Sequence, residues 1–203
     1  MVPFELGRPL GVPGDLELQT RLVMRALALA TNVAVPIIEW FDEASPQPGA
    51  AADSGWACPV NFARRTEAIG LGVEVIQEVA LLRPWHDRAS AARGGTRTGA
   101  AGMPVEAAAD FLASFLDESV AASPNPELTP ADSFKLAAED LKLYYLEAAT
   151  AQPGATSRDL ADWFWKETAA AELLRALAER LSADDNLALR IFATATLVPE
   201  KYR

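Results

Sequence analysis

Residues 130–151, PADSFKLAAEDLKLYYLEAATA, give the strongest indication of the fold class of this chain. Apolar residues recur along it at the spacing of an α-helix, and they occupy more than one side of that helix. One face carries Phe134, Ala137, Ala138, Leu141, Tyr145 and Ala148, and a second carries Leu136, Leu143 and Tyr144. A helix that is apolar nearly all round is typical of the centre of a fold. The sequence therefore predicts that other helices surround residues 130–151.

Two carboxylates lie on the second face of this helix. Asp140 and Glu147 are two turns apart with Tyr144 between them, and their Cα atoms are separated by about 10 Å along the axis. In a central helix both groups are drawn towards surroundings of low dielectric constant and need partners. Either one or both bind arginine side chains from neighbouring helices, or they form an acid–base pair, with Tyr144 or Glu139 nearby, in which one is protonated and the other ionised.

The next helix, predicted over residues 157–181, contains three adjacent aromatic residues, Trp163, Phe164 and Trp165. Successive helical residues point about 100° apart, so the three rings spread over about 200° of the surface. The core stripe of this helix is expected to include Leu160, Phe164 or Trp163, Ala171, Leu174, Leu177 and Leu181. Trp165 points away from that stripe. It is covered by another segment such as residues 33–62 or the N-terminal arm, anchors a homodimer, or lines a ligand pocket.

The remaining sequence predicts an all-α protein. Six or seven helices joined by short loops indicate a single domain over residues 1–203, packed as a bundle or an orthogonal array. Residues 1–14 are expected to form an N-terminal arm, and residues 42–55 and 93–102 flexible loops. VAVPIIEWF and WACPVNF, near residues 33–62, are β-prone but contain proline, so they form a short two-stranded ribbon or two extended arms.

Composition excludes several classes of function. The net charge of −10 argues against nucleic-acid binding and against attraction to an anionic membrane. The start of the chain lacks the pattern of a secretory signal, and no apolar run reaches the roughly 18 residues of a membrane span, which predicts a soluble cytoplasmic protein. One histidine and one cysteine exclude an intramolecular disulfide and the usual zinc sites, so we expect no metal and no cofactor.

One region carries the opposite charge. Residues 83–97 contain four arginines against a single aspartate. The glycines of RGGTRTG, residues 93–99, allow backbone N–H groups to turn towards an anion, which Arg93 and Arg97 would hold through bidentate contacts. The alternative is a solvated loop whose arginines meet the surplus carboxylates of the protein itself.

His86 is the only histidine and is therefore the obvious candidate for a general base, with Asp87 or Arg88 tuning it. The same position is equally compatible with a surface or capping role. Trp85 beside it is counted among the candidate ligand contacts, together with Trp163 and Trp165. A nucleophilic dyad of Cys58 with His86 is conceivable, although a free cysteine is more often a small buried hydrophobic residue.

Three hypotheses for function follow. The first is a binding or accessory protein that holds a small anionic, partly aromatic or apolar molecule, or a protein partner, between helices 130–151 and 157–181 and the arginine-rich loop. The second is a metal-independent enzyme that uses His86 or the Asp140/Glu147 pair for acid–base chemistry, with arginines on an anionic substrate. The third is a structural homo-oligomer in which Trp165 forms the contact.

Overall fold

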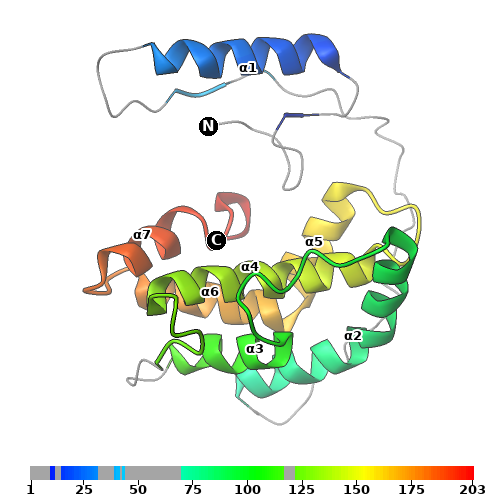
Figure 1. Cartoon of the computed structure of the whole chain (residues 1–203), viewed down its shortest axis with the longest axis vertical. Helices are drawn as coiled ribbons and strands as arrows, with labels where there is room; N and C mark the ends of the chain where they lie inside the picture. The colour runs from blue at the N-terminus through cyan, green and yellow to red at the C-terminus, as the bar shows by residue number, and fades with distance from the viewer. Residues whose placement is uncertain (1–9, 12–14, 32–38, 42, 44–69, 117–121) are drawn as a thin grey trace. The chain divides into compact units, whose positions relative to one another are not determined.

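The computed structural model describes residues 10–11, 15–31, 39–41, 43, 70–116 and 122–203 (Figure 1). These residues form seven α-helices and a short 3-10 turn, with no β-strand among them, which confirms the all-helical prediction. The elements are α1 (Leu16–Ala30), α2 (Leu71–Arg93), α3 (Val105–Ser114), α4 (Pro130–Ala149), α5 (Ser157–Glu167), α6 (Ala169–Leu181), α7 (Leu187–Ala195) and η1 (Glu200–Tyr202).

The chain divides into two compact units, residues 1–56 with 156–158, and residues 57–155 with 159–203. In the first unit, Asp15 is the N-cap of helix α1, and its carboxylate accepts the N–H of Leu18 at 3.1 Å. Leu18 and Leu22 pack with Phe41 into a small buried cluster. The single domain proposed from the sequence stays a prediction.

Several expectations fall on residues outside the described part of the chain. These are the ribbon or extended arms near residues 33–62, the N-terminal arm of residues 1–14, the loop of residues 42–55 and Cys58. Only a few positions within the three ranges are described. The dyad of Cys58 with His86 therefore stays a prediction.

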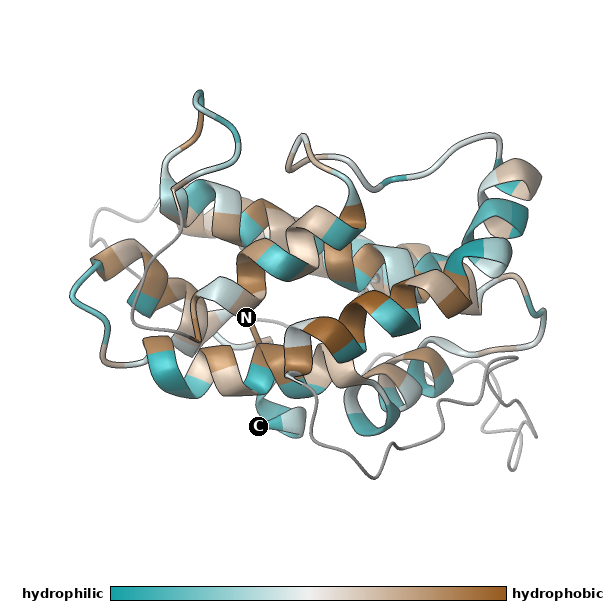
Figure 2. Ribbon diagram, turned by 90° about the horizontal axis from the view of Figure 1, so that it is seen from below, coloured by the Kyte–Doolittle hydropathy of each residue, from teal (hydrophilic) through white to brown (hydrophobic). Residues whose placement is uncertain are grey.

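Helix α4 is the centre of the second unit. It packs against α2, α3, α6 and α7 (Figure 1). Phe134, Leu141 and Tyr145 are completely buried, and the two acids Asp140 and Glu147 are also inside, with 2% and 4% of their surface exposed. The prediction that residues 130–151 form a central helix is thus confirmed. Figure 2 shows hydrophobic and hydrophilic residues alternating along the helices, as amphipathic packing requires.

Helix α2 passes through Pro84 and continues to Arg93, although an interior proline removes one backbone donor of a helix. The helix ends at Gly94, which adopts the left-handed conformation with φ of 81°. The N–H of Gly94 bonds to the carbonyl of Ala91 and that of Gly95 to the carbonyl of Ser90, the pattern of a Schellman cap. This cap turns the chain sharply into the loop of residues 94–104.

The helix predicted over residues 157–181 is two helices, which corrects the sequence-based expectation. Thr168 is extended, with φ of −110° and ψ of 146°, and separates α5 from α6. Its hydroxyl donates to the carbonyl of Phe164 at 2.8 Å and accepts the N–H of Ala171 at 3.1 Å. A threonine hydroxyl competes in this way with the backbone bonds of a helix. The break leaves the N–H of Ala169 to bond both carboxylate oxygens of Glu78 on α2.

The three adjacent aromatic residues of α5 are all buried, with 2–3% of their surface exposed. Phe164 packs edge-on against Tyr145, and Trp163 lies 6.2 Å from the same ring. Trp165 stacks on Tyr202 of η1, with ring centroids 5.8 Å apart and planes inclined by 17°. The ring that points away from the core stripe is therefore covered by the segment of residues 200–202.

In the part of the chain that the structure describes, none of the helices combines the length and the apolar composition needed to cross a bilayer.

Candidate functional site

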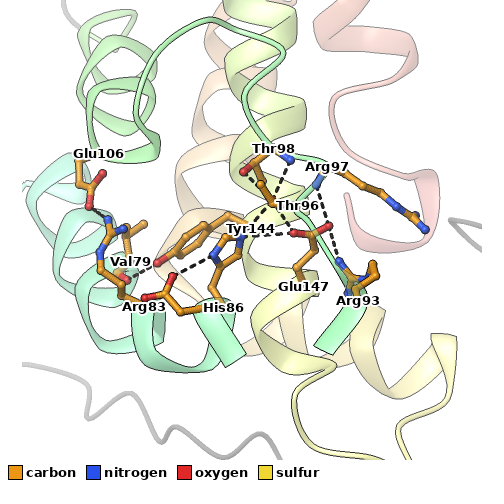
Figure 3. A network of polar contacts seen from close by, with 11 residues as sticks. Val79, Arg83, His86, Arg93, Thr96, Arg97, Thr98, Glu106, Tyr144 and Glu147 are labelled. Carbon is orange, nitrogen blue, oxygen red and sulfur yellow. Dashed lines mark hydrogen bonds and ion pairs between the residues drawn. The ribbon is translucent and has the colours of Figure 1, made fainter. Parts of the chain in front are cut away.

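Glu147 on α4 is the centre of a polar network (Figure 3). One of its carboxylate oxygens accepts from Arg93 Nη1 at 2.6 Å and from the backbone N–H of Arg97 at 3.1 Å. The other accepts the hydroxyl of Thr96 at 2.7 Å and lies 3.3 Å from His86 Nε2. Groups from α2 and from the loop that follows it thus surround this buried carboxylate, and three of them donate hydrogen bonds to it.

Asp140 holds the far end of the same loop. Its two oxygens accept the backbone N–H groups of Ala100 and Ala101, at 3.1 and 2.8 Å. The two acids that the sequence singled out as a pair therefore do not face each other. Each binds a different part of the 94–104 loop and fastens it to the side of α4. Burial of these carboxylates is compensated by hydrogen bonds, as it must be in a folded protein.

His86 is enclosed, with 8% of its surface exposed. Its ring stacks on Tyr144, with centroids 4.3 Å apart and planes inclined by 22°. Nδ1 lies 3.6 Å from the carboxylate of Asp87, and Nε2 lies 3.3 Å from both Glu147 and the hydroxyl of Thr96. The Tyr144 hydroxyl donates to the carbonyl of Val79 at 3.0 Å, and burial raises the pKa of Tyr144 to about 12.

The network has limited capacity for acid–base chemistry. A general base needs a free lone pair that faces the substrate. The Thr96 hydroxyl donates its hydrogen to Glu147, and His86 Nε2 lies 3.3 Å from the same carboxylate, so these groups face one another inside the network. The geometry therefore favours a role for His86 and Glu147 in holding the loop.

The predicted ligand contacts are dispersed. Arg93 binds Glu147 and also donates to the hydroxyl of Thr150 at 3.2 Å, so its cation meets a carboxylate of the protein itself. Arg97 contributes its backbone N–H, while its exposed side chain extends away from Glu147 (Figure 3). Trp163 and Trp165 are in the core, and Trp85 is half-buried on α2.

Glu147→Gln is expected to loosen the loop. Glutamine keeps the shape of the side chain but loses the charge and one acceptor oxygen, so Arg93 loses its ion pair and one loop donor is left unpaired. We expect the free energy of unfolding to fall by about 1–3 kcal/mol and the amide of Arg97 to exchange faster with deuterium, measured by NMR.

Glu172→Gln is the control, since this acid is exposed on α6. This substitution should change neither the free energy of unfolding nor the exchange rate of the Arg97 amide by much. Unaltered protection of the Arg97 amide in Glu147→Gln would show that the carboxylate does not hold the loop.

A cavity of about 350 Å³ lies elsewhere in the second unit, between α6, α7 and the segment that follows α7. It is lined by Arg175, Ala178, Glu179, Ser182, Ala193, Thr194, Val198 and Arg203. Arg175, Ala178 and Glu179 of α6 and its C-cap Ser182 are related by spacings of three and four residues, so they share one face of that helix. The wall combines three charged groups with the buried apolar residues Ala193 and Val198.

Both arginines of the cavity are positioned by backbone carbonyls. Arg175 Nη1 donates to the carbonyl of Trp165 at 2.6 Å. Arg203 donates through Nε to the carbonyl of Val198 at 3.1 Å, and through Nη2 to that of Thr194. Among the described residues neither guanidinium forms an ion pair with a carboxylate. Each has five N–H groups, so each keeps donors for an anion.

The segment that carries Arg203 is attached to α5. Tyr202 stacks on Trp165 and donates its hydroxyl to Asp162, and Lys201 donates to the same carboxylate at 2.9 Å. Burial acts to raise the pKa of Asp162, but the hydrogen bonds from Tyr202, Lys201 and Lys166 outweigh it and hold that pKa well below its usual range. This attachment fixes one wall of the cavity.

Sequence reasoning missed the cavity residues. Arg175 and Glu179 are four apart on a helix, a pattern that indicates an ordinary exposed ion pair. Arg203 is far from both in sequence and is brought near by the packing of α7 and η1. No local motif marks this site.

In the described residues, no group of three or more histidine, cysteine, aspartate or glutamate side chains is arranged to hold a metal ion. Comparison with known proteins adds no identity: no family model matches the chain, and neither the curated proteins nor the solved structures contain a significant match.

Proposed function

We propose that the protein binds a small anionic, partly apolar molecule without transforming it, and that the α6–α7 cavity is the binding site. The observation that carries this proposal is the pair of guanidinium groups, Arg175 and Arg203, on the wall of one cavity with apolar surface beside them. The ligand class is the one expected from the sequence. The place differs from the expected one, which lay between residues 130–151, residues 157–181 and the arginine-rich loop.

The dimensions and chemistry of the cavity support this proposal. Its volume of about 350 Å³ is within the range of small-molecule sites in proteins. Guanidinium groups bind carboxylates through paired, charge-assisted hydrogen bonds. Ala178, Ala193 and Val198 offer an apolar surface to the remainder of the ligand. In a protein with a net charge of −10, two cations that form no ion pair with a carboxylate of the described residues also attract an anion locally.

The other hypotheses have less support. Acid–base catalysis at His86 or at the Asp140/Glu147 pair requires groups that already bind the 94–104 loop. A homodimer contact at Trp165 is not needed to cover this indole, because Tyr202 covers it. Enzymatic activity, formation of a homodimer and binding of a protein partner stay predictions from the sequence.

The proposal is tested with hexanoate as the probe. Hexanoate should shift the NMR signals of α6 and α7, and hexylammonium, which has the same chain and the opposite charge, should not. Arg175→Gln and Arg203→Gln should each weaken hexanoate binding roughly tenfold, because each removes one charged hydrogen-bonding partner.

Arg88→Gln serves as the matched control, because this arginine is exposed on α2 and does not line the cavity. It should leave the affinity for hexanoate unchanged. Binding of hexanoate that survives both cavity substitutions, or equal binding of hexylammonium, would contradict the proposal.

A further inference from the structure

We propose further that the ligand of the α6–α7 cavity is a zwitterion, an α-amino acid with an apolar side chain, whose ammonium group is bound by Glu179. This inference rests on the proposed function and specifies its ligand: the anionic group that the two arginines bind is the carboxylate of a molecule that also carries an ammonium group. Arg175 and Arg203 would hold the carboxylate, and Ala178, Ala193 and Val198 would contact the side chain.

Glu179 supplies the negative charge of the cavity wall. This residue lines the cavity one helical turn after Arg175, and at that spacing on a helix opposite charges normally pair. Arg175 is instead turned towards the carbonyl of Trp165. Among the described residues no cation lies within ion-pair distance of the Glu179 carboxylate. The wall of the cavity thus presents an anion and two cations that do not neutralise one another through direct contact.

The other polar groups of the wall are already engaged. The Ser182 hydroxyl donates to the backbone carbonyl of Glu179 at 2.7 Å, and the Thr194 hydroxyl donates to that of Arg190 at 2.8 Å. Both hydroxyl hydrogens are therefore used within the helices. The strongest groups that remain for a ligand are the two guanidinium groups and the Glu179 carboxylate.

The pattern of charges discriminates between ligand classes. A simple carboxylate would gain from the two arginines but would be repelled by Glu179. A simple amine would be attracted by Glu179 but repelled by the two arginines. A molecule that carries a carboxylate and an ammonium on one carbon, followed by an apolar chain, matches all three charges and the apolar wall. The preference between hexanoate and 2-aminohexanoate therefore measures the role of Glu179 directly, since the two differ only in the amino group.

The experiment titrates both ligands into the full-length protein and into Glu179→Gln, followed by NMR. In the parent protein 2-aminohexanoate should bind more tightly than hexanoate. In Glu179→Gln its binding should weaken roughly tenfold, because a charged hydrogen bond is lost. Hexanoate binding should instead strengthen about two- to threefold, because a repulsive charge is removed. The substitution is therefore expected to change the two affinities in opposite directions.

Glu172→Gln is the control, since Glu172 is an exposed acid on the same helix that does not line the cavity. It should change neither affinity. If Glu179→Gln shifts both ligands in the same direction, Glu179 only balances charge and the inference is overturned, while the binding of hexanoate upholds the proposed function. If neither ligand binds the parent protein, the proposed function fails and this inference fails with it.

Discussion

Phe164→Ala is expected to lower the free energy of unfolding by about 3–5 kcal/mol. Phe164 is 2% exposed, and its ring packs edge-on against Tyr145 at 5.6 Å and against Trp165 at 4.9 Å. Removal of the ring leaves a cavity between α4 and α5 that the neighbouring large side chains cannot fill without moving. Urea unfolding followed by circular dichroism measures the difference.

The matched control is Leu81→Ala on α2, where 55% of the residue is exposed. This substitution should change the free energy of unfolding by less than about 0.5 kcal/mol. A loss of similar size in both variants, or no loss in Phe164→Ala, would show that the aromatic cluster around α5 is not part of a packed core.

The second large effect is a dependence of stability on pH that originates at Glu78. Glu78 has 7% of its surface exposed. Its carboxylate accepts hydrogen bonds from Ala169 N–H and from the hydroxyl of Tyr145. Desolvation raises the pKa of this carboxyl from 4.5 to about 7, although those hydrogen bonds act to lower it. Among the described residues no cation forms an ion pair with it.

The direction of the effect follows from proton binding. Between pH 4.5 and 7 the folded protein holds a proton on Glu78 that the unfolded chain releases. The contribution of Glu78 to stability is therefore fully present below pH 4.5 and is lost as the pH rises to 7. The expected loss is about 3 kcal/mol, from 1.36 kcal/mol per pKa unit.

Glu78→Gln should remove this part of the pH dependence, since the amide is neutral throughout and keeps an acceptor for Ala169 N–H. Urea unfolding at several values between pH 5 and 8 should give a flatter profile for the variant than for the parent protein. Glu74→Gln, one turn earlier on α2, is the control and should retain the parental profile. Parallel profiles for Glu78→Gln and the parent would refute a raised pKa at Glu78.

The fold class could be predicted because it depends on local periodicity. The two apolar faces of residues 130–151 predict that α4 lies at the centre of the fold. Because Asp140 and Glu147 are then buried, both carboxylates need hydrogen-bonding or charged partners. The identity of those partners depends on segments about 40 to 50 residues earlier in the chain, which only the folded structure brings near.

The break between α5 and α6 likewise could not be predicted from the local sequence. The residues around Thr168 include neither glycine nor proline, so local propensity continues the helix. What favours the break is the bond of Ala169 N–H to Glu78, a residue 91 positions away. The α6–α7 cavity could not be predicted either, because Arg203 reaches Arg175 only through the packing of α7 and η1.

The attachment of the 94–104 loop to α4 also sets a limit on chain length. Asp140 and Glu147 are separated by about 10 Å of helix rise, while the loop covers the same interval from Arg97 to Ala100, where three residues span at most about 11 Å. The loop runs antiparallel to the helix with little slack between these two points. Homologous chains that lack a residue at position 98 or 99 would have to give up one attachment, whereas an inserted residue could bulge into solvent.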